Sequence, residues 1–150
     1  IRINGNTITK KDVINFINLY KLQFEKINMS FFEYTVAMAF YQFHKYNVDI
    51  AIIETGLGGR LDSTNIIHPI LTIITNIGLD HMNLLGDSLE KITFEKAGII
   101  KKDIPLVVGS YQKEIDHIIT KKAAENNARV YYAKKSNFMK SDYEISENKT

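Results

Sequence analysis

The stretch "ILTIIT", Ile70 to Thr75, decides the fold that we expect for this sequence. It is a short, nearly continuous apolar run, which is typical of a parallel strand buried on both faces of a sheet. The same pattern occurs earlier in "VDIAIIE", Val48 to Glu54, and later in "PLVVG", Pro105 to Gly109. The segment "ARVYYA", 128–133, reads as a further short strand. The sequence therefore predicts several strands of one parallel sheet.

Amphipathic stretches flank and separate these strands. We predict four helices, in the stretches 9–28, 30–46, 88–102 and 112–127. The third should begin near Ser88, with Asp87 as its cap and Glu90, three residues on, completing a capping box. Ser30 and Glu33 have the same spacing at the start of the second helix. Strands that alternate with helices predict an α/β fold in three layers, in which a mostly parallel sheet carries helices on both faces.

Composition limits the class of protein. The 150 residues fit one domain with a real core, and 45% are hydrophobic. A net charge of +2, with Lys and Glu interspersed, argues against a nucleic-acid partner. No apolar run approaches the roughly 20 residues of a membrane span, and the absence of cysteine fits a cytoplasmic protein. The chain begins with Ile and ends in the polar tail "SDYEISENKT", so we expect it to be a piece of a longer polypeptide.

Polar side chains follow two of the predicted strands. Glu54 ends the first strand, and the second is followed by a polar set: Thr75, Asn76, Asp80 and His81. In open α/β sheets, ligands bind at the carboxyl ends of the strands. We therefore expect these side chains to meet at one edge of the sheet.

Lys96 lies in an unexpected place on the helix that follows Ser88. Winding that helix at about 100° per residue from Leu89 puts Lys96 at about 340°, inside an apolar stripe of Leu89, Ile92, Ile99 and Ile100. One interpretation is a side chain whose stem is buried while its ammonium reaches water. The other is chemical: partial burial depresses the pKa of the amine, which then captures CO₂ and becomes a carbamate that faces a cation.

Glu54 and His81 are both able to ligate a divalent cation, and carboxylate sites commonly hold Mg²⁺. The alternatives are a solvated strand end for Glu54 and a backbone-bonded loop histidine for His81. The loop "GLGGRL", 56–61, is not a dinucleotide-binding fingerprint, because Leu61 takes the place of the third glycine. No P-loop motif occurs in the chain. We expect the glycines to permit a tight turn, with Arg60 and Asp62 at the ligand edge or paired within the loop.

Three long motifs resemble the folylpolyglutamate synthase / dihydrofolate synthase family of the Mur ligase superfamily. They are "ETGLGGRLDSTN", "TNIGLDHMNLLGDSLEKITFEKAGIIK", and the opening "IRING" with "SFFEYTVAMAF". The resemblance runs from residue 1 to about Gly109. It implies that Glu54 and His81 are magnesium ligands, and that Lys96 is a carbamylated lysine near the γ-phosphate of ATP.

The resemblance also implies a pterin-binding surface. Its residues would be Ser30, Phe31, Phe32, Glu33, Leu61, Asp62 and Ser63. Aromatic faces stack on a flat heterocycle, and a carboxylate suits an aminopyrimidine edge. The alternative for the two phenylalanines is core packing, which we favour for at least one of them.

By this resemblance, residues 1–150 are part of a P-loop NTPase-like central ATPase domain, without its N-terminal P-loop and without the C-terminal glutamate-ligase domain. The expected activity is ATP-dependent addition of L-glutamate to folate or dihydropteroate through an acyl phosphate. We expect Mg²⁺ and ATP as cofactors, a cytoplasmic enzyme that is monomeric at full length, and no activity from the fragment alone. The alternatives are another Mur-type ligase acting on a cell-wall precursor, a metal-dependent hydrolase, and a non-catalytic folate-binding or structural module.

Overall fold

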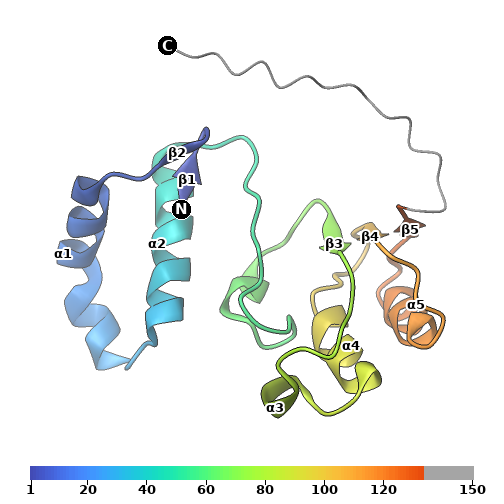
Figure 1. Cartoon of the computed structure of the whole chain (residues 1–150). Coiled ribbons are helices and arrows are strands. Elements are labelled where there is room, and N and C mark those ends of the chain that lie inside the picture. Colours follow the sequence, from blue (N-terminus) through green and yellow to red (C-terminus); the bar gives the residue numbers. More distant parts are fainter. Residues whose placement is uncertain (134–150) are drawn as a thin grey trace. The chain divides into compact units, whose positions relative to one another are not determined.

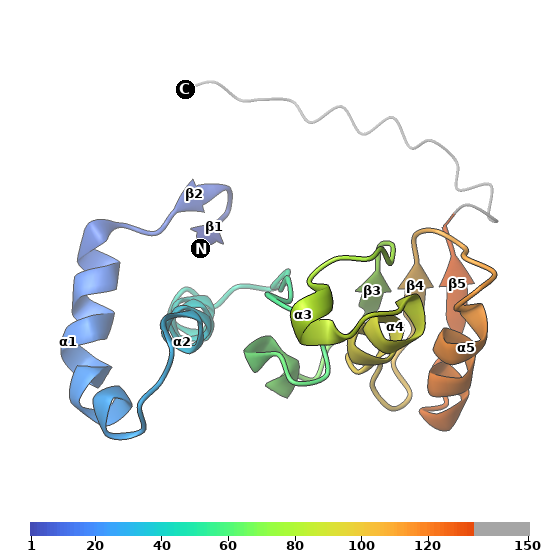
Figure 2. The same ribbon diagram turned by 60° about the horizontal axis from the view of Figure 1, so that its bottom comes forward.

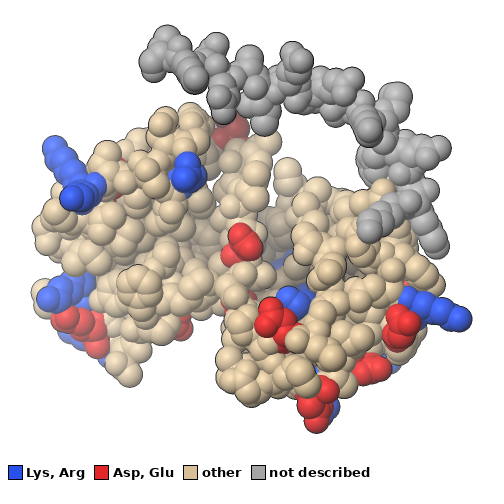
Figure 3. Space-filling view, in the orientation of Figure 1, with Lys and Arg blue, Asp and Glu red and all other residues tan. Residues whose placement is uncertain are grey.

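The computed structural model describes residues 1–133, so the polar tail at 141–150 lies outside the described residues. The chain divides into two compact units, Ile1–Ile67 and His68–Thr150, which are described separately (Figure 1). Within residues 1–133 we find no helix with the length and apolarity that crossing a bilayer would need. On the face shown in Figure 3, acidic and basic side chains are interspersed, as the sequence pattern predicts.

Unit 1 is mainly a pair of helices. A small antiparallel hairpin, β1 (Arg2–Ile3) and β2 (Asn6–Thr7), precedes α1 (Lys10–Lys26) and α2 (Phe31–Lys45), and a short 3₁₀ helix, η1 (Ser63–Ile66), follows. Thr9 caps α1 and Ser30 caps α2, each in a reciprocal capping box. The predicted start of the second helix at Ser30, with Glu33 three residues on, is therefore confirmed.

The two helices pack through aromatic rings and one buried carboxylate. Phe16 is 1% exposed, and its ring centroid lies 5.4 Å from that of Tyr41 on α2. Asp12, 5% exposed, accepts a hydrogen bond from Lys45 Nζ at 2.6 Å and another from the Tyr46 hydroxyl at 3.2 Å. The bonds from Lys45 and from Thr9 hold the pKa of Asp12 well below its usual range. A buried carboxylate is tolerated here because it is paired and hydrogen-bonded.

Unit 2 is a parallel sheet with helices. Its strands are β3 (Thr72–Ile74), β4 (Leu106–Val108) and β5 (Val130–Tyr132), in the segments predicted from their apolar runs, and they lie in the order β3-β4-β5. The helices are α3 (Met82–Leu85), α4 (Leu89–Ala97) and α5 (Asp116–Glu125) (Figure 2). The α/β fold class with a parallel sheet is confirmed.

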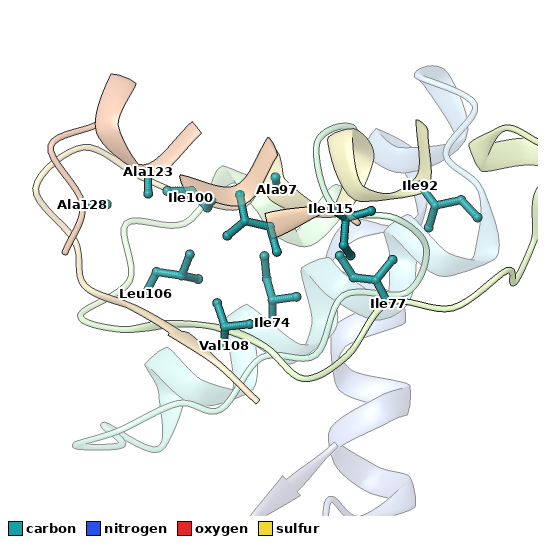
Figure 4. Close-up of a cluster of buried hydrophobic side chains, with 11 residues drawn as sticks. Ile74, Ile77, Ile92, Ala97, Ile100, Leu106, Val108, Ile115, Ala123 and Ala128 are labelled. Atoms are coloured by element: carbon teal, nitrogen blue, oxygen red, sulfur yellow. The ribbon is translucent and has the colours of Figure 1, made fainter. Parts of the chain in front are cut away.

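The core of unit 2 lies between the sheet and the helices α4 and α5 (Figure 4). Leu106 and Ile92 are fully buried, and Ile77 is 2% exposed. Alternate strand residues point the other way, where Ile73 is 54% exposed and Tyr131 is 39% exposed. This alternation is the two-residue period of a strand with one covered face.

The prediction of a buried strand at Val48–Glu54 is wrong for the described structure. The segment forms no strand, and Ile50 and Ile52 are 72% and 92% exposed. An apolar run supplies side chains for a sheet, but a strand also needs a neighbour for its backbone hydrogen bonds. Within residues 1–133, this segment has no such neighbour.

The predicted cap and stripe of α4 also need correction. Ser88 is the cap and accepts a hydrogen bond from Lys91 N at 3.3 Å, whereas Asp87 pairs with Lys91 Nζ at 2.9 Å. With the cap one residue later than predicted, Glu90 no longer stands three residues after it and no capping box forms. The helix ends at Ala97, so Ile99 and Ile100 lie beyond it, and its buried side is formed by Ile92, Thr93 and Ala97.

Candidate functional site

The glycine loop of unit 1 is organised by the carboxylate of Asp62. One of its oxygens accepts the backbone N–H groups of Gly56 and Leu57, both at 2.9 Å. The other accepts from Thr64, from the backbone N–H at 2.9 Å and from the hydroxyl at 2.5 Å. Burial would raise the pKa of Asp62, but these hydrogen bonds outweigh burial and lower it. The carboxylate therefore folds the loop that follows Glu54.

Phe32 covers the same loop. A Cβ atom built on Gly56 would lie only 2.3 Å from the Phe32 ring, so the ring packs directly on the glycine backbone. Phe31, by contrast, is 87% exposed. Of the two phenylalanines, Phe32 has a packing role within unit 1, and Phe31 offers a free aromatic face.

The other predicted substrate residues lie at two helix starts and in the loop. Glu33 accepts the Ser30 backbone N–H at 2.7 Å, and its bonds to Ser30 hold the pKa of Glu33 below its usual range. Ser63 begins η1, and Leu61 is 78% exposed. Contact of any of these residues with a pterin stays a prediction.

His81 is presented by the loop that follows β3. Its backbone has a left-handed φ of 52°, and its N–H donates to Asp80 Oδ1 at 2.9 Å. It begins α3, where its carbonyl accepts the N–H groups of Leu84 and Leu85. The imidazole is 56% exposed, with Nε2 at 3.8 Å from Asp80 Oδ2. The backbone is thus fixed while the ring remains accessible to a ligand.

Lys96 is partly buried in the last turn of α4, beside Ala97, which is 1% exposed. Its amine forms no ion pair within residues 1–133, unlike Lys91 on the same helix, which pairs with Asp87. Glu54 is exposed and likewise has no hydrogen-bonding partner for its carboxylate in the described part of the chain. Within residues 1–133, Glu54 and Lys96 therefore have no side-chain partner, and the imidazole of His81 has only Asp80 nearby.

Whether these three groups meet stays a prediction. Glu54 belongs to unit 1 and His81 and Lys96 belong to unit 2, and the positions of the two units relative to one another are not determined. Residues 1–133 contain no group of three or more His, Asp or Glu side chains that could hold a metal. The predicted set contains only two such side chains, and its third oxygen donor would come from a carbamate on Lys96. The carboxylate of Glu54 and a carbamate on Lys96 are oxygen donors of the kind that Mg²⁺ prefers, whereas the imidazole of His81 is an uncommon ligand for it.

One residue that the sequence analysis missed is Gln112, in the loop after β4. Its side chain bonds both backbone groups of Ile77, from a position 35 residues away. No local signal in the sequence marks this contact, because neither its spacing nor its residue type is part of a motif.

Unit 2 is an α/β unit with a parallel sheet in which an exposed imidazole follows a strand, and in unit 1 an exposed carboxylate precedes a glycine loop. The sequence profile of the Mur ligase middle domain matches residues 5–150, and the chain belongs to this family.

Individual proteins and solved structures are also similar to this chain. The chain is 42% identical, over 135 residues, to the dihydrofolate synthase/folylpolyglutamate synthase of Bacillus subtilis, covering 85% of this chain and 31% of that protein. Two solved structures, each 33% identical with a TM-score of 0.80, are an FPGS–AMPPCP–folate complex and E. coli FolC in complex with DHPP and ADP. They cover 88% and 87% of this chain, and 34% and 31% of their own. The chain thus spans about a third of the length of these proteins. Its predicted resemblance to the folylpolyglutamate synthase / dihydrofolate synthase family is confirmed.

Proposed function

We propose that the protein to which this chain corresponds is an ATP-dependent ligase that joins L-glutamate to folate or dihydropteroate. The observation that carries the proposal is the 42% identity to the Bacillus subtilis dihydrofolate synthase/folylpolyglutamate synthase over most of the chain. The solved relatives, with their bound AMPPCP and folate or DHPP and ADP, support a nucleotide and a pterin-type substrate. Because the chain spans about a third of these proteins, the activity is proposed for the whole protein.

In the proposed reaction the substrate carboxylate attacks the γ-phosphate of ATP, giving an acyl phosphate and ADP. The amine of glutamate then attacks the acyl carbon, and inorganic phosphate leaves. Catalysis of this kind depends mainly on positioning and on the stabilisation of developing charge.

Glu54 and His81 would hold Mg²⁺, and Lys96 would join them as a carbamate. The metal would neutralise negative charge on the phosphates. The accessible imidazole of His81 and the exposed carboxylate of Glu54 support this assignment. The partial burial of Lys96, whose amine has no acidic partner in residues 1–133, supports modification at this lysine.

Phe31 would stack on the pterin ring, which its 87% exposure supports. Phe32 and Asp62 would act indirectly, without touching the pterin, by holding the glycine loop that they contact in its shape. Leu61, exposed in the same loop, would add apolar contact area. A cytoplasmic, monomeric enzyme remains our prediction for the whole protein.

A test compares two lysines of one helix in the full-length protein. Lys96→Arg keeps the positive charge but removes the amine that forms a carbamate, and Lys91→Arg is the matched control on the exposed side of α4. We expect Lys96→Arg to lower ATP- and glutamate-dependent product formation at least about 100-fold, because even groups that merely support metal ligands contribute 10–100-fold. Lys91→Arg should leave the rate unchanged.

A second readout detects the modification itself. With carbon-13 bicarbonate, the full-length protein and Lys91→Arg should show a carbamate signal by NMR, and Lys96→Arg should lack it. Three outcomes would contradict the proposed function: amide formation only with a cell-wall precursor, hydrolysis with metal but no ATP, or pterin binding without turnover. The 150-residue chain alone should form no product.

A further inference from the structure

The loop that carries His81 is tied to the sheet by a side chain. Gln112 Oε1 accepts the backbone N–H of Ile77 at 2.9 Å, and Gln112 Nε2 donates to the Ile77 carbonyl at 2.7 Å. Both distances are those of good hydrogen bonds. A side-chain amide has the same donor and acceptor as a peptide group, so Gln112 acts here as a neighbouring strand would.

The two hydrogen bonds between Gln112 and Ile77, called the clamp below, begin where the backbone hydrogen bonds between β3 and β4 end. The β3–β4 pairing runs from Thr72 with Leu106 to Ile74 with Val108, and a last bond joins Gly109 N to Ile74 O at 2.8 Å. Ile77 lies three residues beyond β3, where the chain has left the sheet. Its side chain is 2% exposed and belongs to the core of unit 2 (Figure 4). A backbone buried at such a place needs partners for its polar groups.

Gln112 is itself held in place. Its carbonyl accepts the N–H groups of Ile115 and Asp116 at 3.2 and 3.0 Å, at the start of α5. Ile115 is 1% exposed, and the Asp116 carboxylate accepts a hydrogen bond from the hydroxyl of Tyr132, the last residue of β5. Burial and the neighbouring Asp116 carboxylate raise the pKa of Tyr132, so its hydroxyl stays protonated as the donor. One connected set of hydrogen bonds therefore joins the carboxyl ends of β3, β4 and β5.

The clamp lies four residues before His81. Between them Gly78, Leu79 and Asp80 are exposed, and Asp80 N donates to Gly78 O at 2.9 Å in a tight turn. Beyond His81, the next residue that packs against the core is Leu85. The imidazole is thus carried by an exposed segment. On the side of β3, this segment is attached to the core through the buried Ile77.

We propose that Gln112 is a positioning residue for His81, because it fixes the end of the loop from which the imidazole reaches the metal. The inference rests on the proposed function, in which His81 is a ligand of Mg²⁺. Groups that orient a metal ligand typically change metal affinity or activity 10–100-fold when they are removed.

The test uses the full-length enzyme and two substitutions. Gln112→Leu has a similar volume and removes both hydrogen bonds. Gln112→Glu keeps the acceptor for the Ile77 N–H and places a carboxylate oxygen against the Ile77 carbonyl, and it serves if the leucine variant does not fold. Lys113→Leu, at the exposed neighbouring residue, is the control for a new apolar side chain in this loop.

Two measurements separate positioning from mere stability. Without metal or nucleotide, amide hydrogen exchange at Ile77 should become about two- to tenfold faster in Gln112→Leu, which corresponds to the loss of an ordinary hydrogen bond. In turnover, the Mg²⁺ concentration for half-maximal rate should rise about 10–100-fold, while the rate at saturating Mg²⁺ stays near that of the parent. Lys113→Leu should change neither quantity.

His81→Ala tests the assignment of His81 as a Mg²⁺ ligand separately from the positioning role of Gln112. If His81→Ala raises the Mg²⁺ concentration for half-maximal rate and the Gln112 variants do not, the positioning role is wrong while the proposed function stands. If neither the His81 nor the Gln112 substitution changes the Mg²⁺ concentration for half-maximal rate, both the ligand assignment and the positioning role are wrong. Unchanged exchange at Ile77 in Gln112→Leu would overturn the clamp itself.

Discussion

Gly109 is the position where adding one methyl group should damage unit 2 most clearly. It follows β4, and its N–H donates to Ile74 O at 2.8 Å. A Cβ atom built on Gly109 would lie 2.4 Å from the carbonyl oxygen of Thr75, whereas real Cβ atoms essentially never approach closer than 3.0 Å. The obstacle is backbone, so no side-chain rotation relieves it. Gly109→Ala should therefore push the ends of β3 and β4 apart.

The magnitude follows from two opposed effects. Overpacking a tight site costs about 1–3 kcal/mol. The backbone of Gly109 is outside the left-handed region, so alanine also restricts the unfolded chain, which stabilises by about 0.4–1 kcal/mol. We expect a net loss of about 1–2 kcal/mol, which corresponds to a fall of the unfolding midpoint of about 2–8 °C for a chain of this size.

The assay is thermal and urea unfolding of the 150-residue chain, followed by far-ultraviolet circular dichroism. Gly78→Ala is the matched control, because a Cβ atom at Gly78 would have nothing within 4 Å and its φ is not left-handed. That variant should be as stable as the parent or slightly more stable. Equal stability of the two alanine variants would refute the predicted clash with Thr75, since the same methyl group at Gly78 meets no obstacle.

Three further predictions concern local contacts, and unfolding in urea checks all of them. Ser88→Ala should destabilise the chain by about 1 kcal/mol through loss of the α4 cap. Asp87→Ala should have a smaller effect, and the reverse order would contradict the assignment of the cap. Ile92→Ala should cost about 2–5 kcal/mol because Ile92 is fully buried, and a loss below 1 kcal/mol would show that the site collapses around the cavity. Asp12→Asn should be less stable than the parent at neutral pH, and the difference should shrink as the pH falls below about 4. The reason is that the pKa of Asp12 is lower in the folded chain than in the unfolded chain. The resulting stability is present above the unfolded pKa and is lost as the carboxylate is protonated. A difference that is constant down to pH 2 would exclude this contribution.

The sequence by itself determined the features that arise from neighbouring residues. Three short apolar runs became β3, β4 and β5, and the spacing of Ser30 and Glu33 gave the start of α2. Such patterns are readable because a strand's period and a helix cap depend on residues within a few positions. The motifs around Glu54, His81 and Lys96 likewise pointed to the Mur ligase family, to which the chain belongs.

Only the tertiary structure decided how those patterns are used. Val48–Glu54 has the composition of a buried strand, yet Ile50 and Ile52 are exposed because no neighbouring strand pairs with the segment in residues 1–133. Asp62, expected either at the ligand edge or in a pair within the loop, holds the glycine loop with four hydrogen bonds. Gln112 reaches Ile77 across 35 residues. These outcomes depend on which donors, acceptors and surfaces meet after folding, and the order of residues along the chain does not encode such meetings locally.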